Sequence, residues 1–104
     1  MSPPLSEYCM DRLRADFQGE AEAAAAMLAG YGSQPHHREA ERVRRDMIHL
    51  AAGSLDKMKE LLNLANTDYR DLIVYAEYEP DPEKQGLWNL RKKATPWLQG
   101  AAGE

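Results

Sequence analysis

Apolar residues recur with helical spacing along most of the chain, most clearly between Pro35 and Gly53. Apolar side chains fall on one side of a 3.6-residue helix, and basic side chains fall on the opposite side. The apolar set is Ala40, Val43, Met47, Leu50 and Ala51, and the basic set is Arg38, Arg42, Arg45 and His49. Pro35 suits the first helical turn and Gly53 suits the position after the last one. The pattern therefore predicts a helix over residues 35–52.

Other stretches with this spacing predict three more helices. The first covers residues 6–30, with Gly19 as a candidate bend. Ser54 is a predicted N-cap, because its hydroxyl can accept a hydrogen bond from an unpaired amide, and it begins a helix over 54–66. A fourth helix over 68–79 begins with acidic residues, and two prolines follow it. Apolar residues at 87, 90, 94 and 98 predict a short carboxy-terminal helical segment over 86–98.

Short connections between these helices predict antiparallel helix pairs in one domain over residues 1–99, followed by a frayed tail over 100–104. Composition supports this all-α prediction. The 104 residues include 15 alanines and 12 leucines but six β-branched residues, too few to furnish a sheet. Alanine buries little area, so we expect a modest core.

Charge and cysteine content narrow the function classes. The net charge of −4 disfavours extensive binding to nucleic acids or anionic membranes. No apolar run approaches the roughly 20 residues that span a bilayer, and the first residues do not form a secretory signal. The single Cys9 cannot form an intrachain disulfide and is expected to pack in the core. We therefore expect a cytoplasmic protein.

The sequence predicts no catalytic residues, cofactor or metal site. Three histidines and one cysteine are too few and too scattered for a zinc site. The Glu-x-x-His pairs of di-iron bundles do not occur. Glu20 points into the apolar stripe of the first helix near Asp16, where a buried carboxylate pair would have perturbed protonation. We prefer the alternative that Gly19 bends the helix and leaves both carboxylates in water.

The fourth helix has apolar residues on two sides. Leu72, Ile73 and Ala76 form one face with Tyr69, while Val74, Tyr75 and Tyr78 lie near the opposite face. A helix of this kind is usually buried on both sides. Its second cover is either the chain's own Trp88, Leu90 and Trp97 or another polypeptide.

These residues lead to the main functional hypothesis, a non-enzymatic protein–protein interaction or regulatory module, with a homodimer as one form of it. Tyrosine and tryptophan are enriched at interfaces because they combine a large apolar area with a polar tip. The expected partner surface consists of Val74, Tyr75, Tyr78, Trp88 and Trp97. Glu77 and Glu79 are expected to steer the partner electrostatically.

A second hypothesis is a nucleic-acid-associated regulator that contacts phosphates through Arg38, Arg42, Arg45 and His49. Against it, Glu41 with Arg45 and Arg42 with Asp46 are spaced as helical ion pairs. A third hypothesis is a small helical enzyme that uses Glu20 and a histidine. Within the chain, the basic tail of Arg91, Lys92 and Lys93 is expected to attract the acidic stretch over residues 67–85.

One region also has a family resemblance. It consists of the runs ERVR from Glu41, IHLAAGSLDKM from Ile48, DYRDL from Asp68 and AEY from Ala76. Across residues 41–78 the chain resembles a group of small, uncharacterised bacterial α-helical proteins. The resemblance implies a compact helical fold and a bacterial cytoplasmic origin, and it implies no activity.

Overall fold

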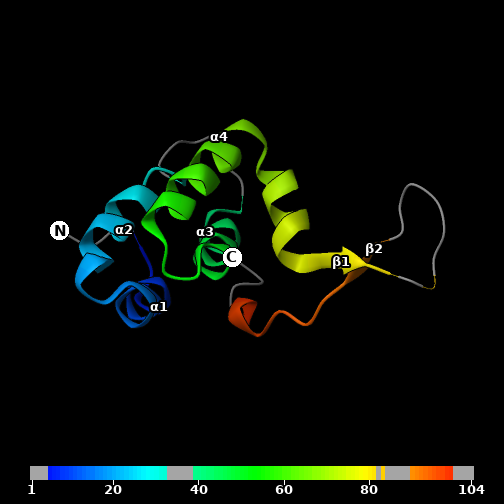
Figure 1. Cartoon of the computed structure of the whole chain (residues 1–104), viewed down its shortest axis with the longest axis horizontal. Helices are drawn as coiled ribbons and strands as arrows, with labels where there is room; N and C mark the ends of the chain where they lie inside the picture. The colour runs from blue at the N-terminus through cyan, green and yellow to red at the C-terminus, as the bar shows by residue number, and fades with distance from the viewer. Residues whose placement is uncertain (1–4, 33–38, 82, 84–89, 100–104) are drawn as a thin grey trace.

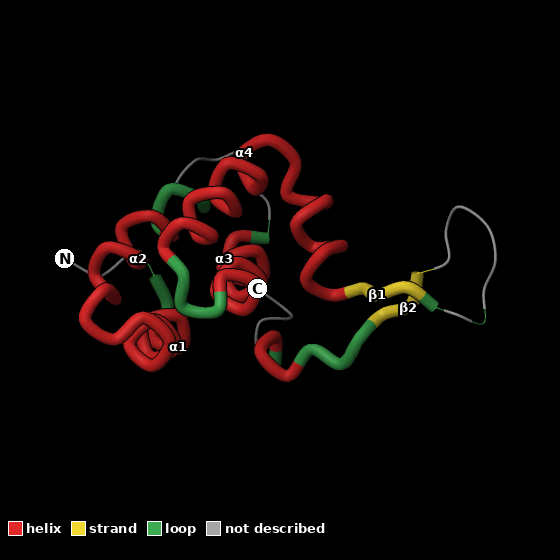
Figure 2. The backbone as a smooth tube through the Cα atoms, viewed as in Figure 1, coloured by secondary structure: helices red, strands yellow, loops and turns green. Residues whose placement is uncertain are grey.

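Most of the described chain is helical, as the composition predicts. The computed structural model describes residues 5–32, 39–81, 83 and 90–99. Its helices are α1 (Glu7–Phe17), α2 (Ala21–Leu28), α3 (Ala40–Ala51) and α4 (Leu55–Glu77), with the short 3-10 turns η1 (Gln18–Glu20) and η2 (Pro96–Leu98). Two short strands, β1 (Tyr78–Pro80) and β2 (Leu90–Lys92), complete the elements (Figures 1 and 2).

The amino-terminal helix breaks where a bend was expected. Gln18 adopts φ +51°, and η1 separates α1 from α2. Asp16 forms an ion pair with Arg12 at 3.3 Å, and Glu20 is exposed. The preferred interpretation of Asp16 and Glu20 is therefore confirmed, because the break turns Glu20 away from the core. Cys9 is fully buried, as predicted.

The turn between α3 and α4 also forms as predicted. Gly53 has φ +85°, which glycine adopts readily, and Ser54 Oγ accepts a hydrogen bond from the Lys57 amide. The predicted break between helices over 54–66 and 68–79 is present as a kink within α4, which ends at Glu77. Asp68 has non-helical dihedral angles, φ −155° and ψ 95°, and its side chain accepts a hydrogen bond from the Arg70 amide. The count of four main helices is not confirmed, because the predicted first helix is divided into α1 and α2 and the last two are joined at this kink.

The carboxy-terminal helical prediction is wrong for residues 90–95. Leu90–Lys92 forms a strand antiparallel to Tyr78–Pro80, with Glu79 opposite Arg91, and the two side chains form an ion pair at 3.0 Å. Residues 93–95 are not helical, and only Pro96–Leu98 forms a 3-10 turn. The strand pair supplies hydrogen-bond partners that a short isolated helix would lack, and it brings the basic tail to the acidic stretch as expected. Residues 33–38, 84–89 and 100–104, with the predictions made for them, lie outside the described residues.

The core lies between α1, α2, α3 and α4, and it includes Leu72 and Ile73 beyond the kink of α4 (Figure 1). α3 and α4 make the most extensive contact. The second half of α4 continues past the kink to the strand pair, at the end of the molecule away from α1 and α2 (Figure 2). We call residues 69–80 and 90–92 the arm. Within the described part of the chain, no helix has the length and apolar character needed to cross a membrane.

The turn at Gly53 predicts that alanine substitutions at Gly53 and Gly19 have different effects on stability. A Cβ at Gly53 would lie 2.6 Å from the Asp16 carbonyl oxygen, whereas a Cβ at Gly19 would meet nothing within 4 Å. Gly53→Ala should therefore lower the free energy of unfolding by about 1–3 kcal/mol, because it combines strained backbone with a clash. The matched Gly19→Ala control should change it by less than about 0.5 kcal/mol. Urea denaturation followed by circular dichroism tests this, and equal effects would contradict it.

Candidate functional site

Several charged side chains of α3 are buried. Glu41, Arg44, Arg45 and Asp46 are all buried together with the apolar side of the helix. η2 packs against α3 on this side, and α1 also contacts the helix. Because charged groups are rarely buried unless they are paired, the partners of these side chains determine what the site can do.

Arg45 is held by partners from three parts of the chain. Its Nε donates to Glu41 Oε2 at 2.6 Å, which confirms the predicted Glu41–Arg45 pair. Its Nη1 donates to the carbonyls of Trp97 and Gln99 at 3.2 and 2.8 Å. The guanidinium also lies 4.0 Å from the centroid of the Tyr8 ring. Arg45 therefore has a structural role, because it holds residues 97–99 against α3.

Glu41, the carboxylate partner of Arg45, also contacts the buried Cys9. Glu41 Oε2 accepts hydrogen bonds from Ser6 Oγ at 2.7 Å and Cys9 Sγ at 3.7 Å. Burial, opposed by a hydrogen bond with Ser6 and reinforced by the Glu41 charge, raises the pKa of Cys9 to about 11. The thiol is therefore protonated at neutral pH, which suits a core residue and does not suit a nucleophile.

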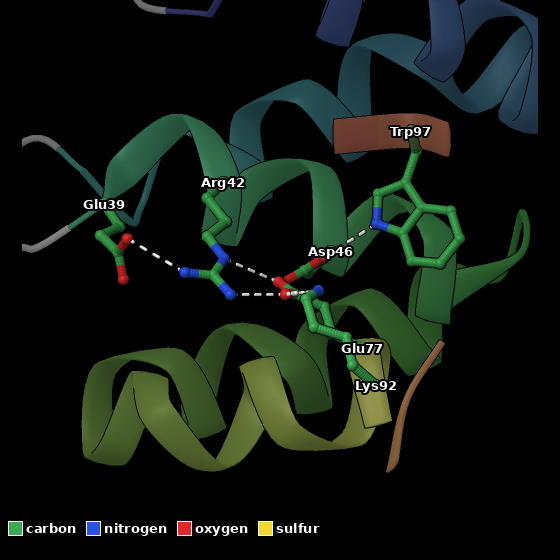
Figure 3. Close-up of polar contacts among 6 residues, drawn as sticks. All are labelled: Glu39, Arg42, Asp46, Glu77, Lys92 and Trp97. Carbon is green, nitrogen blue, oxygen red and sulfur yellow. Dashed lines mark hydrogen bonds and ion pairs between the residues drawn. The ribbon is translucent and has the colours of Figure 1, made fainter. Parts of the chain in front are cut away.

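Arg42 binds the last residue of α4. Its Nε and Nη2 donate to the two carboxylate oxygens of Glu77 at 2.8 and 2.5 Å, and its Nη1 lies 3.2 Å from Glu39 Oε1. Lys92 of β2 also donates to Glu77 Oε1 at 2.9 Å (Figure 3). The predicted Arg42–Asp46 ion pair is therefore wrong, because Arg42 reaches across to α4 for a bidentate partner.

Glu77 is 0% exposed, so its predicted role in steering a partner is also wrong. Burial by itself would raise the pKa of Glu77. Hydrogen bonds from Arg42, Asp46 and Lys92 outweigh that effect and lower the pKa to about 2. Glu77 is therefore a buried carboxylate at neutral pH, held by two cations.

Asp46 lies beside this carboxylate and is also 0% exposed. Its Oδ1 accepts a hydrogen bond from Trp97 Nε1 at 2.8 Å (Figure 3). Burial, together with the hydrogen bond to Glu77, raises the pKa of Asp46 to about 8. The Asp46 carboxyl therefore holds its proton to a higher pH than an exposed aspartate, beside the ionised Glu77. The burial of Glu77 could have been predicted from the sequence, because Glu77 lies one turn after Ile73 on the apolar face of its helix.

The Trp97 side chain packs against α3. Its ring stacks on His49 with centroids 3.6 Å apart and planes at 9°. The two rings, with Tyr8, Arg12 and Pro96, line a pocket of about 370 Å³. Burial, with smaller contributions from Lys93 and Arg12, lowers the pKa of His49. In the described part of the chain, no group of three or more His, Cys, Asp or Glu side chains is arranged to hold a metal ion.

The predicted partner surface is divided by the fold. Val74 and Tyr75 are 37% and 65% exposed, and they are the exposed large hydrophobic residues of the described chain. Tyr78 is partly buried, and Lys92 Nζ lies 5.6 Å from its ring centroid. Trp97 lies on α3 instead, and Trp88 lies outside the described residues. The arm therefore keeps Val74, Tyr75 and Tyr78 together.

The predicted phosphate-contacting set is placed differently. Arg42 and Arg45 bind carboxylates, and His49 is stacked against Trp97. Arg38 lies outside the described residues. The described members of this set therefore have partners within the chain.

The buried network predicts unequal effects of two arginine substitutions. Arg42→Ala should lower the free energy of unfolding by about 3 kcal/mol, because it leaves the buried Glu77 with Lys92 as its remaining cation. Arg91→Ala, which removes the exposed pair with Glu79, should cost about 0.5 kcal/mol or less. Urea denaturation of both variants measures the difference. A loss at Arg42 no larger than that at Arg91 would show that the buried pair does not stabilise the fold.

No family model, curated protein or solved structure matches this chain. The resemblance to small bacterial helical proteins over residues 41–78 therefore stays a prediction.

Proposed function

We propose that the chain is a non-enzymatic protein–protein interaction module that self-associates through the arm. The observation that carries this proposal is the exposure of Val74 and Tyr75 side by side on α4. Trp97, one of the side chains expected to cover them, is bound to α3. An exposed tyrosine offers a large apolar area and a hydroxyl that can hydrogen bond at an interface.

The exposed face is a helical stripe. Asp71, Val74 and Tyr75 follow the spacing i, i+3 and i+4, so their side chains lie along one side of α4, and Tyr78 follows as the first residue of β1. Leu72, Ile73 and Ala76 occupy the opposite side and are buried in the core. The helix is therefore fixed to its own chain by one face and can offer the other to a partner.

Charge favours a second copy of the chain as that partner. Asp71 is exposed, lies one turn before Val74 and forms no ion pair with any described residue. Lys92 lies over Tyr78 at the other end of the stripe, and although it also binds Glu77 its side chain is 47% exposed. Two arms that pack antiparallel about a twofold axis near Val74 and Tyr75 would place Asp71 of each copy near Lys92 of the other. An isologous interface of this kind is the commonest arrangement in homodimers.

The other two hypotheses have less support. Phosphate binding by α3 would compete with Glu77 for Arg42 and with Glu41 for Arg45, and both carboxylates are already bound. An enzyme that uses Glu20 would need a neighbouring group that orients it, but Glu20 is exposed on η1 and forms no hydrogen bond or ion pair with a histidine of the described chain.

The self-association proposal predicts the behaviour of Tyr75→Ser. The variant should remain folded, because the side chain is 65% exposed. It should weaken the dimer by about 2 kcal/mol, or roughly 30-fold, as expected for a tyrosine near the centre of an interface. Sedimentation velocity over a concentration series measures the dissociation constant, and circular dichroism reports the fold.

Two further variants sharpen this test. Asp71→Lys should weaken the dimer in a salt-dependent manner, because it would place like charges opposite each other. Lys59→Ser, at an exposed position in the first half of α4, is the control and should leave association unchanged. A wild-type chain that stays monomeric at every concentration, or a dimer unaffected by Tyr75→Ser, would overturn the proposal.

A further inference from the structure

We propose that the Asp46–Glu77 carboxyl pair is a proton-dependent clasp that holds the end of the arm against α3. Loss of the Asp46 proton would release the end of α4 and the strand pair. The clasp itself does not depend on the dimer, and only its effect on association rests on the proposed function.

The position of the pair is the first argument for a clasp. Glu77 is the last residue of α4 and directly precedes β1, while Asp46 lies on α3. Lys92 from β2 binds Glu77, and Trp97 from η2 binds Asp46 (Figure 3). The Lys93 amide also donates to the Glu77 carbonyl at 2.8 Å. Four elements therefore meet at these two side chains.

The unpartnered oxygen of Asp46 also favours a clasp that depends on a proton. Asp46 Oδ2 is buried and receives no hydrogen bond from a donor group of the described chain. A buried carboxylate oxygen without a donor is costly, whereas a protonated Oδ2 can donate to the neighbouring Glu77 carboxylate. A proton on Asp46 Oδ2, facing Glu77, satisfies this buried oxygen, whereas an ionised Asp46 leaves it without a donor.

The charged groups around Asp46 explain why its ionisation would separate the pair. Glu77 faces it from α4, Arg42 faces it from its own helix, and η2 contributes the uncharged indole of Trp97. Lys92 from β2 binds Glu77. Because the hydrogen bonds of Arg42 and Lys92 go to Glu77, ionised Asp46 would meet a carboxylate at close range with no donor for Oδ2. Moving Glu77 away from α3 relieves the repulsion and lets water reach Oδ2, at the cost of the Arg42–Glu77 hydrogen bonds.

The packing of α4 limits how far the release extends. Leu72 and Ala76 are fully buried, and Ile73 is 8% exposed, so they hold the middle of the arm in the core. The strand pair has only three residues in each strand, and an isolated two-stranded hairpin is marginal in water. We therefore expect the change to be confined to the last turn of α4 and the strand pair. That segment includes Tyr78 and Lys92, one end of the proposed interface.

The direction of the pH effect follows from the two shifts. The pKa of Asp46 is raised from 3.8 to about 8, so its contribution to stability is complete below about pH 4 and is lost as pH rises to about 8. The pKa of Glu77 is lowered from 4.5 to about 2, so its contribution is lost as pH falls through that range. The clasp is therefore closed in mildly acidic and neutral solution and opens on mild alkalinisation.

The experiment uses Trp97 as the probe. Trp88→Phe leaves it as the single tryptophan of the full chain, and its indole donates to Asp46. We expect Trp97 fluorescence to show a one-proton transition with a midpoint near pH 8 between pH 6 and 10. Carbon-detected NMR should show one carboxyl carbon titrating over the same range.

Asp46→Asn is the decisive variant in the Trp88→Phe chain. Its amide oxygen can accept from Trp97 and its NH₂ can donate to Glu77, so it reproduces the protonated acid at every pH. We expect it to abolish both transitions. Asp11→Asn makes the same chemical change at an exposed position of α1, outside the arm, and should keep them.

Three results would overturn the clasp. They are an Asp46 carboxyl that titrates below pH 5, a transition that survives in Asp46→Asn, and an Asp46 titration near pH 8 without a change in Trp97 fluorescence. The carboxyl titration of the wild-type chain decides the first point even if Asp46→Asn fails to fold. Sedimentation velocity at pH 6.5 and 9 measures dimerisation with the clasp closed and open, and so distinguishes the clasp from the proposed function. A Trp97 transition in a chain that never dimerises would support the clasp and reject the proposed function.

Discussion

The structure depends on one constraint, the need to satisfy three carboxyl groups buried on or against α3. Glu41, Asp46 and Glu77 are each removed from water, and each must find hydrogen-bond donors. Those donors come from α1, α3, β2 and η2. The network therefore sets where the amino-terminal segment, the end of α4 and the carboxy-terminal tail lie.

This network accompanies a hydrophobic core in which many of the buried side chains are small. Alanines contribute five of the buried positions in α2, α3 and α4, and each removes less apolar area from water than a leucine would. Buried ion pairs contribute little net stability relative to apolar packing, but breaking one is strongly destabilising. We interpret the network as a device that specifies one arrangement of the chain ends. The small core supplies most of the favourable burial.

The same arrangement links the two proposals. Trp97 is drawn onto α3 by Asp46 and His49, and it therefore does not cover Val74 and Tyr75. The arm is anchored by its buried face and by Glu77, with its tyrosine face outward. A change in the protonation of Asp46 would act on the tail and on the strand pair together, because one carboxyl pair contacts both.

The sequence by itself determined the features that depend on neighbours a few residues away. Helical periodicity, the stop at Gly53 and the cap at Ser54 are local, and the Glu41–Arg45 pair is four residues apart. Tertiary structure decided the rest. The strand at Leu90–Lys92 needs a partner strand 10 to 14 residues away, and Glu77 meets Arg42 across 35 residues. Periodicity shows which residues share a face, but whether a polar face is solvated or buried depends on segments that pack against it from elsewhere in the chain.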